Sequence, residues 1–397
     1  MKILLVTPRY FPYIGGTETH VHEVGRRLVE YGVSVTLLTV MPPDAGLPRE
    51  EIQHGMRIIR VKALSSRNDY FFAPEIYTIV ARGGWDLVHC QGCHTFVPIL
   101  AMLAARKAKI PYIVTFHTGG HSSQLRHRLR SAQWRTLRPL LAGSAKLIGV
   151  SRFEADHFCK LLHIPAQHFA VIPNGLNQLS LDSLANIKKL YNNNSNVNGS
   201  GNTNDSSSNN REITETHLII SPGRLERYKG HQHMIQALPL IREQYPAARL
   251  VILGTGPYEA SLRKLAQRMG VAAHVEIRMI PPGNRHEMIE LLARASLISL
   301  LSEYEAHPVS IVEALAVKRP VLVTHTSGMQ ELAEQGLVRS VPLHSSPQTI
   351  AAAALEQIAN PLIPAHVSLP TWDDSAHELY ETYRHIINTV SSSGAKE

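Results

Sequence analysis

Cysteine is scarce in this chain of 397 residues, which contains only Cys90, Cys93 and Cys159. Three thiols cannot build the disulfide framework of a small secreted protein, so stability must come from a hydrophobic core. Cys90 and Cys93 have the spacing of a metal-binding or redox pair, but no second pair of ligands follows downstream. We therefore expect a loop of small residues here and no metal site.

Long hydrophobic runs are also missing. No stretch of eighteen or more apolar residues is present, so the sequence predicts no membrane-spanning helix. The first residues, MKILLVTPRYFP, have a short apolar core that runs into arginine and proline without a small-residue cleavage site. This start is typical of a buried first strand rather than a signal peptide, and it predicts a cytoplasmic protein.

Negative charge is in deficit, because 40 lysines and arginines outnumber 32 acids and leave a net charge of +8. This surplus suits an anionic partner, which could be a nucleotide, a phospholipid surface or nucleic acid. Much of it lies in a helical stretch, residues 124–141, that lacks interleaved aromatics, so we expect no nucleic acid partner. The stretch could contact an anionic membrane peripherally, cap a crevice over a phosphorylated acceptor, or form a solvated helix face.

The length predicts two domains, because one core rarely serves so long a chain. Residues 192–210, NNNSNVNGSGNTNDSSSNN, are too polar to bury the surface that would offset the entropy of ordering. We expect an N-terminal domain over residues 1–178 and a linker over 179–215 that contains this disordered insertion. A C-terminal domain should follow over 216–370, and a helix over 371–390 should pack back on the N-terminal domain.

Apolar runs of strand length alternate with amphipathic stretches in both halves. In the first half we expect strands at 3–7, 34–40, 57–61, 86–89, 112–116, 146–150 and 169–172, and helices at 17–31 (capped by Thr17), 96–107 and 124–141. In the second half we expect strands at 218–221, 249–253, 295–301 and 320–324, and helices at 231–243, 258–268, from near 308, from 326–328 and at 372–389. This alternation predicts α/β domains with parallel sheets, whose ligands bind beyond the carboxyl ends of the strands.

Two features mark that edge in the first half. Gly15 and Gly16 occupy the first strand-to-helix turn, where glycine allows a ligand to approach the backbone closely. The dinucleotide-binding pattern of three spaced glycines is absent, and no acid ends the second strand. His117 ends a strand just before two glycines, so it should face the crevice, whereas His20, His22 and His121 carry no such signal.

The second half combines cations and acids at its strand ends. Arg224 and Lys229 lie in the glycine loop that begins at Gly223, and a guanidinium fork with an ammonium suits a diphosphate. Glu305 and Glu313 flank the junction between the strand at 295–301 and the helix from near 308, close to helix N-termini that favour phosphate. Acids at such a place make sense as acceptors for sugar hydroxyls. The combination predicts a site for a nucleotide joined to a sugar.

In their order along the chain, these motifs resemble the retaining nucleotide-sugar glycosyltransferases of the GT-B fold, specifically glycosyltransferase family 4. The resemblance rests on the glycine pair, His117, the 223–230 loop, the 254–257 turn (GTGP) and the two glutamates. It covers nearly the whole chain apart from the asparagine-rich insertion. It implies two Rossmann-like domains that face each other across a cleft, with a C-terminal helix that crosses back to the N-terminal domain. The donor would bind mainly to the C-terminal domain and the acceptor to the N-terminal one.

The resemblance also assigns roles. Arg224 and Lys229 would hold the donor diphosphate and stabilise the charge of the departing nucleotide. Glu305 would contact the sugar hydroxyls, Glu313 the ribose, and His117 the transferred sugar near its reacting carbon.

Further donor-site positions follow from the same resemblance. Gly15 and Gly16 would let the first loop close over donor and acceptor, and Gly223, His307 and Val309 would line the donor site. Enzymes of this family need no divalent metal and no cofactor, because cationic side chains substitute for the metal.

The chain departs from the family after the first glutamate, where the usual E-G-F-G is replaced by EAHP over residues 305–308. Pro308 removes a backbone N–H that could bond a sugar hydroxyl. The side chain of Ala306, in place of glycine, limits how closely a sugar can approach the backbone. The leading hypothesis is transfer of a hexosyl group from a nucleoside-diphosphate sugar to a hydroxyl of a lipid, a glycan or a small molecule, in glycolipid or cell-surface polysaccharide synthesis. The alternatives are a nucleotide-sugar epimerase or hydrolase of the same fold, and a non-catalytic nucleotide-sugar-binding protein.

Overall fold

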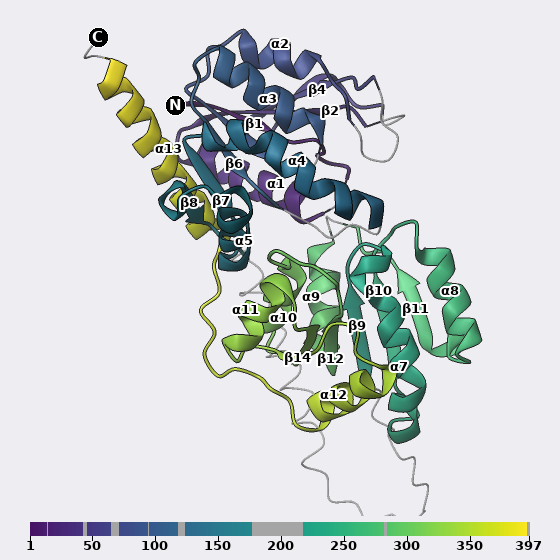
Figure 1. Cartoon of the computed structure of the whole chain (residues 1–397). Coiled ribbons are helices and arrows are strands. Elements are labelled where there is room, and N and C mark those ends of the chain that lie inside the picture. Colours follow the sequence, from purple (N-terminus) through teal and green to yellow (C-terminus); the bar gives the residue numbers. More distant parts are fainter. Residues whose placement is uncertain are drawn as a thin grey trace, which may run out of the picture. The chain divides into compact units, whose positions relative to one another are not determined.

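The computed structural model describes residues 1–13, 15–42, 46–64, 71–93, 95–117, 124–176, 217–281 and 284–394, without the side chains of 124–132, 285, 393 and 394. The insertion at 192–210, the linker that contains it, Gly119, Gly120 and His121 lie outside these residues. The chain divides into two compact units (Figure 1). Unit 1 comprises residues 1–175, 305–308 and 370 to the C-terminus, and unit 2 comprises residues 176–304 and 309–369.

In the described residues of unit 1, the core is a sheet of eight strands. In spatial order these are β3 (Glu50–Gln53), β4 (Met56–Val61), β2 (Ser34–Val40), β1 (Lys2–Val6), β5 (Leu87–Gln91), β6 (Tyr112–Thr115), β7 (Lys146–Gly149) and β8 (Phe169–Val171). Every neighbouring pair is parallel except β3 and β4. The chain order changes direction at β1, which pairs with β2 and β5, so the topological switch point lies at the carboxyl ends of β1 and β5.

Strand β3 is one element that the sequence analysis did not predict. It pairs antiparallel with β4 around His54 and Gly55, whose φ angles of 48° and 77° form a two-residue hairpin turn. Its sequence, EEIQ, is mostly polar, and the side chain of Ile52 is 76% exposed. An edge strand with so little apolar surface has no alternating hydrophobic signal to detect.

The helices of unit 1 are α1 (Gly16–Glu30), α2 (Glu75–Ala81), α3 (Phe96–Lys107), α4 (Gln124–Ala142), α5 (Arg152–Leu162) and α13 (Trp372–Gly394). The expected N-cap at Thr17 is wrong, because α1 begins at Gly16 and Gly15 is its N-cap. Thr17 therefore lies inside the first turn. Glycine is an accepted residue at the N-cap, since it adopts the extended backbone that this position requires.

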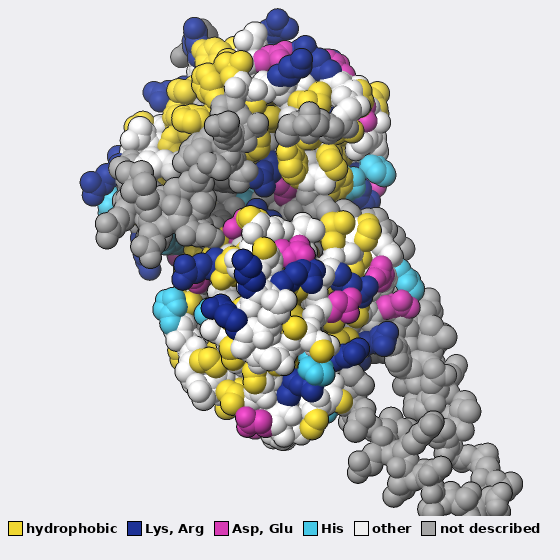
Figure 2. All heavy atoms as spheres, turned by 90° about the vertical axis from the view of Figure 1, so that its right-hand side faces the viewer, with side chains coloured by type: hydrophobic (Ala, Val, Ile, Leu, Met, Phe, Trp, Pro, Cys, Tyr) yellow, Lys and Arg dark blue, Asp and Glu magenta, His cyan; other side chains and the backbone are white. Residues whose placement is uncertain are grey.

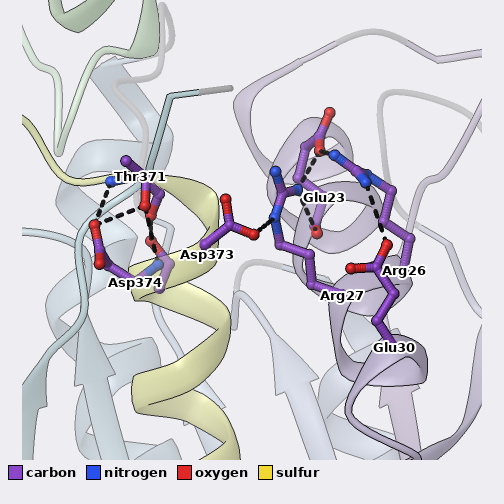
Figure 3. A network of polar contacts seen from close by, with 8 residues as sticks. Glu23, Arg26, Arg27, Glu30, Thr371, Asp373 and Asp374 are labelled. Atoms are coloured by element: carbon purple, nitrogen blue, oxygen red, sulfur yellow. Dashed lines mark hydrogen bonds and ion pairs between the residues drawn. The ribbon is translucent and has the colours of Figure 1, made fainter. Parts of the chain in front are cut away.

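Helix α13 packs on α1, and Figure 3 shows the polar contacts that join them. Arg27 of α1 is buried, and its Nε donates to Asp373 Oδ1 at 2.7 Å while its Nη1 donates to Glu23 Oε2 at 2.6 Å (Figure 3). Thr371 caps α13, because its Oγ1 accepts from the backbone N–H of Asp374 at 3.1 Å. The last helix of the chain is thus an integral part of unit 1.

The described part of unit 2 is built on a six-stranded sheet in which every neighbouring pair is parallel. Its spatial order is β11 (Val275–Arg278), β10 (Arg249–Leu253), β9 (Leu218–Pro222), β12 (Leu297–Leu300), β13 (Val321–Thr324) and β14 (Arg339–Val341). The expected strand at 295–301 shortens at both ends to β12. The switch point of this sheet lies at the carboxyl ends of β9 and β12.

The helices of unit 2 are α7 (His231–Gln244), α8 (Glu259–Arg268), α9 (Arg285–Arg294), α10 (Val309–Ala316), α11 (Ser327–Glu334) and α12 (Pro347–Ala359). Successive strand residues point to opposite faces, so Ile219 packs in the cluster that includes α7 and α12, and Ile220 in the cluster that includes α9, α10 and α11. Helices therefore cover both faces, which explains why these strands are continuously apolar (Figure 1). Figure 2 shows basic and acidic side chains interspersed on the face that carries α8, where Arg263 pairs with Glu259 at 2.8 Å.

Candidate active site

The loop after β9 lies at the switch point of unit 2. It contains Gly223 and Gly230, with φ angles of 145° and 77°, and the 3-10 turn Arg227–Lys229. A Cβ added at Gly230 would lie 1.9 Å from the backbone oxygen of Leu301, just beyond β12. The loops that follow the two central strands are therefore in backbone contact, and only glycine permits this approach.

Both cations predicted for the diphosphate lie in this loop, around one buried tyrosine that the sequence analysis missed. Tyr228 is 4% exposed, and its hydroxyl accepts a hydrogen bond from Arg224 Nη2 at 2.9 Å. The ammonium of Lys229 lies 5.5 Å from the centroid of the same ring. Tyr228 therefore organises the guanidinium and the ammonium together, although its own side chain is hidden from solvent.

The backbone of the loop after β9 is held in place by hydrogen bonds and by close packing. His231 is fully buried, and its two ring nitrogens contact Ser221 Oγ at 2.8 Å and the backbone oxygen of Arg224 at 3.2 Å. A Cβ at Gly254 would lie 1.9 Å from the backbone oxygen of Gly223. The 254–257 turn thus supports the cationic loop by close backbone packing.

The segment after β12 is attached to the same loop. The backbone N–H of Glu303 donates to the carbonyl of Tyr228 at 2.7 Å, and Ser302 Oγ donates to the carbonyl of Lys229 at 3.3 Å. Thr326, the N-cap of α11, donates from Oγ1 to the carbonyl of Glu303 at 3.3 Å. The ends of β9 and β12 and the start of α11 therefore converge on one edge of unit 2.

The two predicted acids fall in different settings. Glu313 is buried on α10, within unit 2, and Val309 is the first residue of that helix. Glu305 and His307 belong to the segment 305–308, which groups with unit 1. Glu313 therefore belongs to unit 2, as do Arg224 and Lys229. Glu305 belongs to unit 1, as does His117.

The glycine pair of unit 1 starts α1. Gly15 is its N-cap, and an added Cβ there would meet Glu18 Oε2 at 2.4 Å, whereas a Cβ at Gly16 would meet nothing within 4 Å. Only the first glycine is therefore constrained by its neighbours. The second leaves open space beside the backbone at the carboxyl edge of the sheet.

His117 follows β6 with a left-handed backbone, φ 45°, which is uncommon for a residue with a side chain. Its Nε2 lies 2.7 Å from Gln91 Oε1, at the end of β5. The ring of His20, from α1, lies 4.6 Å from the ring of His117 at an angle of 68°. The structure thus brings two residues to His117 that the sequence analysis did not single out.

A second buried contact joins α1 to the segment 305–308. His20 Nδ1 lies 3.0 Å from Asn174 Oδ1, and Asn174 Nδ2 donates to the backbone oxygen of His307 at 3.1 Å. Burial lowers the pKa of His20 and of His307 to about 4, so both rings are neutral at pH 7. Asn174 belongs to a Pro-Asn-Gly sequence that reads locally as a turn, which conceals its bridging contacts.

Cys90 and Cys93 are both buried in unit 1 and are not joined in a disulfide. Burial raises the pKa of both thiols, which keeps them protonated at neutral pH. Among the residues that the structure describes, no three histidines, cysteines or acids are grouped so as to hold a metal ion.

The basic stretch at 124–141 forms α4. In its described second half, Trp134, Leu137 and Leu140 are buried in the core of unit 1, while Arg135 and Arg138 are exposed. Arg138 Nε donates to the carbonyl of Leu162 at 2.8 Å. None of the described helices is both long enough and apolar enough to cross a bilayer.

Two family models match the chain, one in each half. Residues 14–178 match Glycosyltransferase Family 4, and residues 202–368 match Glycosyl transferases group 1. The chain is 26% identical to an uncharacterized glycosyltransferase of Methanocaldococcus jannaschii, over 84% of this chain and 82% of that protein. It is 24% identical to the phosphatidyl-myo-inositol mannosyltransferase of Mycobacterium leprae, over 100% of this chain and 99% of that protein.

Solved structures share the fold. The Anabaena protein HepE, in complex with UDP-glucose, superposes with a TM-score of 0.69 at 17% identity, over 99% of this chain and 100% of that one. A glycosyltransferase from Rickettsia africae superposes with a TM-score of 0.68 at 17% identity, over 97% and 98% of the two chains. With a parallel-sheet unit in each half and a matching family model for each, this chain belongs to the glycosyltransferases of the GT-B fold that combine the family 4 and group 1 domains.

Proposed function

We propose that this protein transfers a hexosyl group from a nucleoside-diphosphate sugar to an acceptor hydroxyl with retention of configuration. The observation that carries the proposal is the cationic loop at the switch point of unit 2, where Arg224 and Lys229 surround Tyr228. Open α/β sheets bind their ligands at this position. The Anabaena and Rickettsia structures support the fold, and the Anabaena protein was solved with UDP-glucose, a donor of this class.

In the proposed reaction, the bond between the anomeric carbon and the diphosphate oxygen breaks. A bond from that carbon to the acceptor oxygen forms on the same face, and the acceptor proton is released. The departing nucleoside diphosphate gains negative charge, which Arg224 and Lys229 stabilise because they are fixed in place before the reaction. No divalent metal and no cofactor is required in this proposal, since the two cations supply the positive charge.

The remaining site residues keep the roles that the family resemblance implies. Glu313 binds the ribose, Glu305 contacts the sugar hydroxyls, and His117 contacts the transferred sugar. Gly15 and Gly16 admit the ligand to the start of α1, and Gly223, His307 and Val309 line the donor site. The open space beside Gly16 and the constrained backbone of His117 support this assignment.

The acceptor is proposed to be lipid-linked, in glycolipid or cell-surface polysaccharide synthesis on the cytoplasmic side of a membrane. On unit 1, Phe72 and Phe96 are 41% and 47% exposed, with ring centroids 6.0 Å apart. Neighbouring exposed apolar side chains of this kind can contribute to a surface that contacts a membrane. Together with the basic helix α4, they support peripheral contact with an anionic membrane.

The proposal is tested with Lys229→Ala and Glu305→Ala. We expect each to lower kcat by about a hundredfold or more at an unchanged melting temperature, because each removes a charged contact to the donor. Lys264→Ala, which removes an exposed lysine of α8, is the matched control and should retain activity. Wild-type-like turnover in both site variants would reject the site, and loss of transfer on adding EDTA would reject metal independence.

Donor identity is approached by a thermal-shift screen of nucleotide sugars, UDP and GDP forms first, because a ligand of the folded state raises the melting temperature. Product analysis with donor alone separates transfer from epimerisation or hydrolysis, since a transferase turns over slowly without acceptor.

The segment 305–308, with alanine and proline in place of two glycines, favours one other candidate, a non-catalytic nucleotide-sugar-binding protein. Calorimetric binding of a nucleotide without turnover across an acceptor panel would support that candidate instead.

A further inference from the structure

A chain of buried hydrogen bonds leads from His117 to the last helix of unit 1. His117 Nε2 lies 2.7 Å from Gln91 Oε1, and Gln91 Nε2 lies 3.2 Å from His89 Nε2. His89 Nε2 also lies 2.8 Å from Thr115 Oγ1, and His89 Nδ1 lies 2.7 Å from the hydroxyl of Tyr383 in α13. Gln91 is 2% exposed, and the other three partners beyond it are fully buried. Water therefore does not compete for these bonds.

The donors and acceptors of this chain determine where the protons lie. Burial lowers the pKa of His89 to about 3, so its ring is neutral and carries one hydrogen. In this orientation of the Gln91 amide, its nitrogen donates to His89 Nε2, which also accepts from the Thr115 hydroxyl, so His89 Nδ1 carries the hydrogen that it donates to Tyr383. Gln91 Oε1 can only accept, and it faces His117. The hydrogen between them must therefore belong to His117 Nε2.

The orientation of His117 is not one that its local sequence favours. Its left-handed backbone costs free energy in a residue with a side chain, so the surrounding structure must hold it in place. The ring of His20 contacts the ring of His117, and His89 is linked to His117 through Gln91. His20 is neutral at pH 7, and its Nδ1 is engaged with Asn174.

We propose that Gln91 is a positioning residue that holds His117 in the tautomer with hydrogen on Nε2, and that Tyr383 of α13 sets Gln91 through His89. The inference rests on the proposed function, in which His117 contacts the sugar. In this tautomer Nδ1 is the acceptor nitrogen of the ring.

The test is nitrogen NMR of the full chain labelled with ¹⁵N-histidine, because the two ring nitrogens of a neutral histidine have distinct shifts. His117 is assigned by the signals lost in His117→Asn. We expect the wild type to show hydrogen on Nε2. Gln91→Ala should give a mixture of tautomers, and Gln91→Glu, whose oxygens still accept, should restore the Nε2–H form. Hydrogen on Nδ1 in the wild type, or unchanged signals in Gln91→Ala, would overturn the proposal.

Tyr383→Phe tests the distal part of the chain and changes only one hydroxyl. It should shift the His89 signals and partly mix the tautomers of His117. Tyr10→Phe is the matched control, because Tyr10 is also buried in unit 1 and bonds a histidine, His22, at 2.8 Å. It should leave the His117 signals unchanged. If the two variants behave alike, the chain through His89 does not set the tautomer.

Kinetics then separates positioning from a structural role. Gln91→Ala should lower kcat by roughly tenfold to a hundredfold, with a smaller change in donor KM, because a misplaced ring affects the reacting geometry most. The melting temperature is measured alongside. A fall in melting temperature with the tautomer and kcat unchanged would assign Gln91 a structural role only. The NMR result remains decisive if no transfer is detected, so failure of the proposed function is distinguishable from failure of this inference.

Discussion

Tyr228 illustrates how a buried residue without charge determines the arrangement of two charged ones. Its hydroxyl accepts from Arg224 and its ring lies beneath the ammonium of Lys229, so both cations are oriented before any ligand arrives. Arg224 itself is exposed, and the bond to Tyr228 restricts the rotamers that its side chain can adopt. Pre-ordering of this kind lowers the entropy that a ligand must overcome on binding.

At this scale we predict that Tyr228→Phe raises the donor KM about threefold to tenfold. The change removes the acceptor for Arg224 but keeps the ring beside Lys229, and one hydrogen bond to an exposed guanidinium contributes roughly 1 kcal/mol. Initial rates over a range of donor concentrations measure the effect. Tyr245→Phe is the control, because that ring contacts His217 away from the cationic loop. An unchanged KM in Tyr228→Phe would show that the hydroxyl does not order Arg224.

Single residues differ in how far the sequence reveals them. Arg224 and Lys229 are visible because charges in a glycine loop after a strand are a local pattern. Gln91 and His20 are not, because one ends an apolar strand and the other lies on a helix among many histidines. Their importance comes from burial against His117, and burial depends on neighbours that are distant in the chain.

At the scale of elements, the contact between the loops after β9 and β12 is the most constrained feature of unit 2. Gly230 approaches Leu301 so closely that any side chain would displace one of the two loops. Because Lys229 precedes this glycine, the position of its ammonium depends on that contact. The local sequence reports a glycine turn but not the partner on which it packs.

We predict that Gly230→Ala destabilises the protein more than Gly270→Ala does. Both glycines have a left-handed backbone, with φ of 77° and 69°, and so share a strain of about 1 kcal/mol. A Cβ at Gly270 meets nothing within 4 Å, whereas the clash at Gly230 adds roughly 1–3 kcal/mol of overpacking. The free energy of unfolding is measured by urea titration of the full chain. Equal losses in the two variants would mean that the loop shifts without cost.

At the scale of the whole molecule, unit 1 contains histidines whose pKa values are strongly lowered by burial. His20 and His89, both in unit 1, have pKa values lowered by burial to about 4 and about 3, against an ordinary value of about 6.5. Between pH 6.5 and 4 the unfolded chain therefore binds protons that the folded unit does not. The free energy of unfolding must fall as the pH decreases through this range.

We predict that the free energy of unfolding of unit 1 decreases from pH 6.5 to pH 4, with a limiting slope of about 1.4 kcal/mol per pH unit for each of these histidines, and that its melting temperature falls accordingly. Calorimetry of the full chain at several pH values measures it. His20→Gln should flatten the slope, because an amide does not take up a proton. His385→Gln, which removes an exposed histidine of α13, should not. A slope that is the same in all three proteins would contradict the prediction.

The architecture was largely predictable. The parallel α/β halves and the GT-B family are confirmed by the two sheets and the two family models. Strands β2 and β10 and helix α3 have the bounds that the sequence predicts. The N-cap of α1 was placed two residues too late. Strand β3, which has no apolar signal, was missed, and the sequence analysis also did not predict the strands β11 and β14 or the helices α2, α5, α9 and α12. The assigned site residues remain predictions.

The sequence by itself determined the alternation of buried strands and amphipathic helices, and the glycine and charge patterns at their ends, because both follow from periodicity and local backbone preference. Only the tertiary structure decided which of those ends meet and which side chains are buried between them. His89 and Tyr383 are 294 residues apart in sequence, yet their side chains share a hydrogen bond. Such contacts depend on strand order and helix packing, which no local pattern encodes.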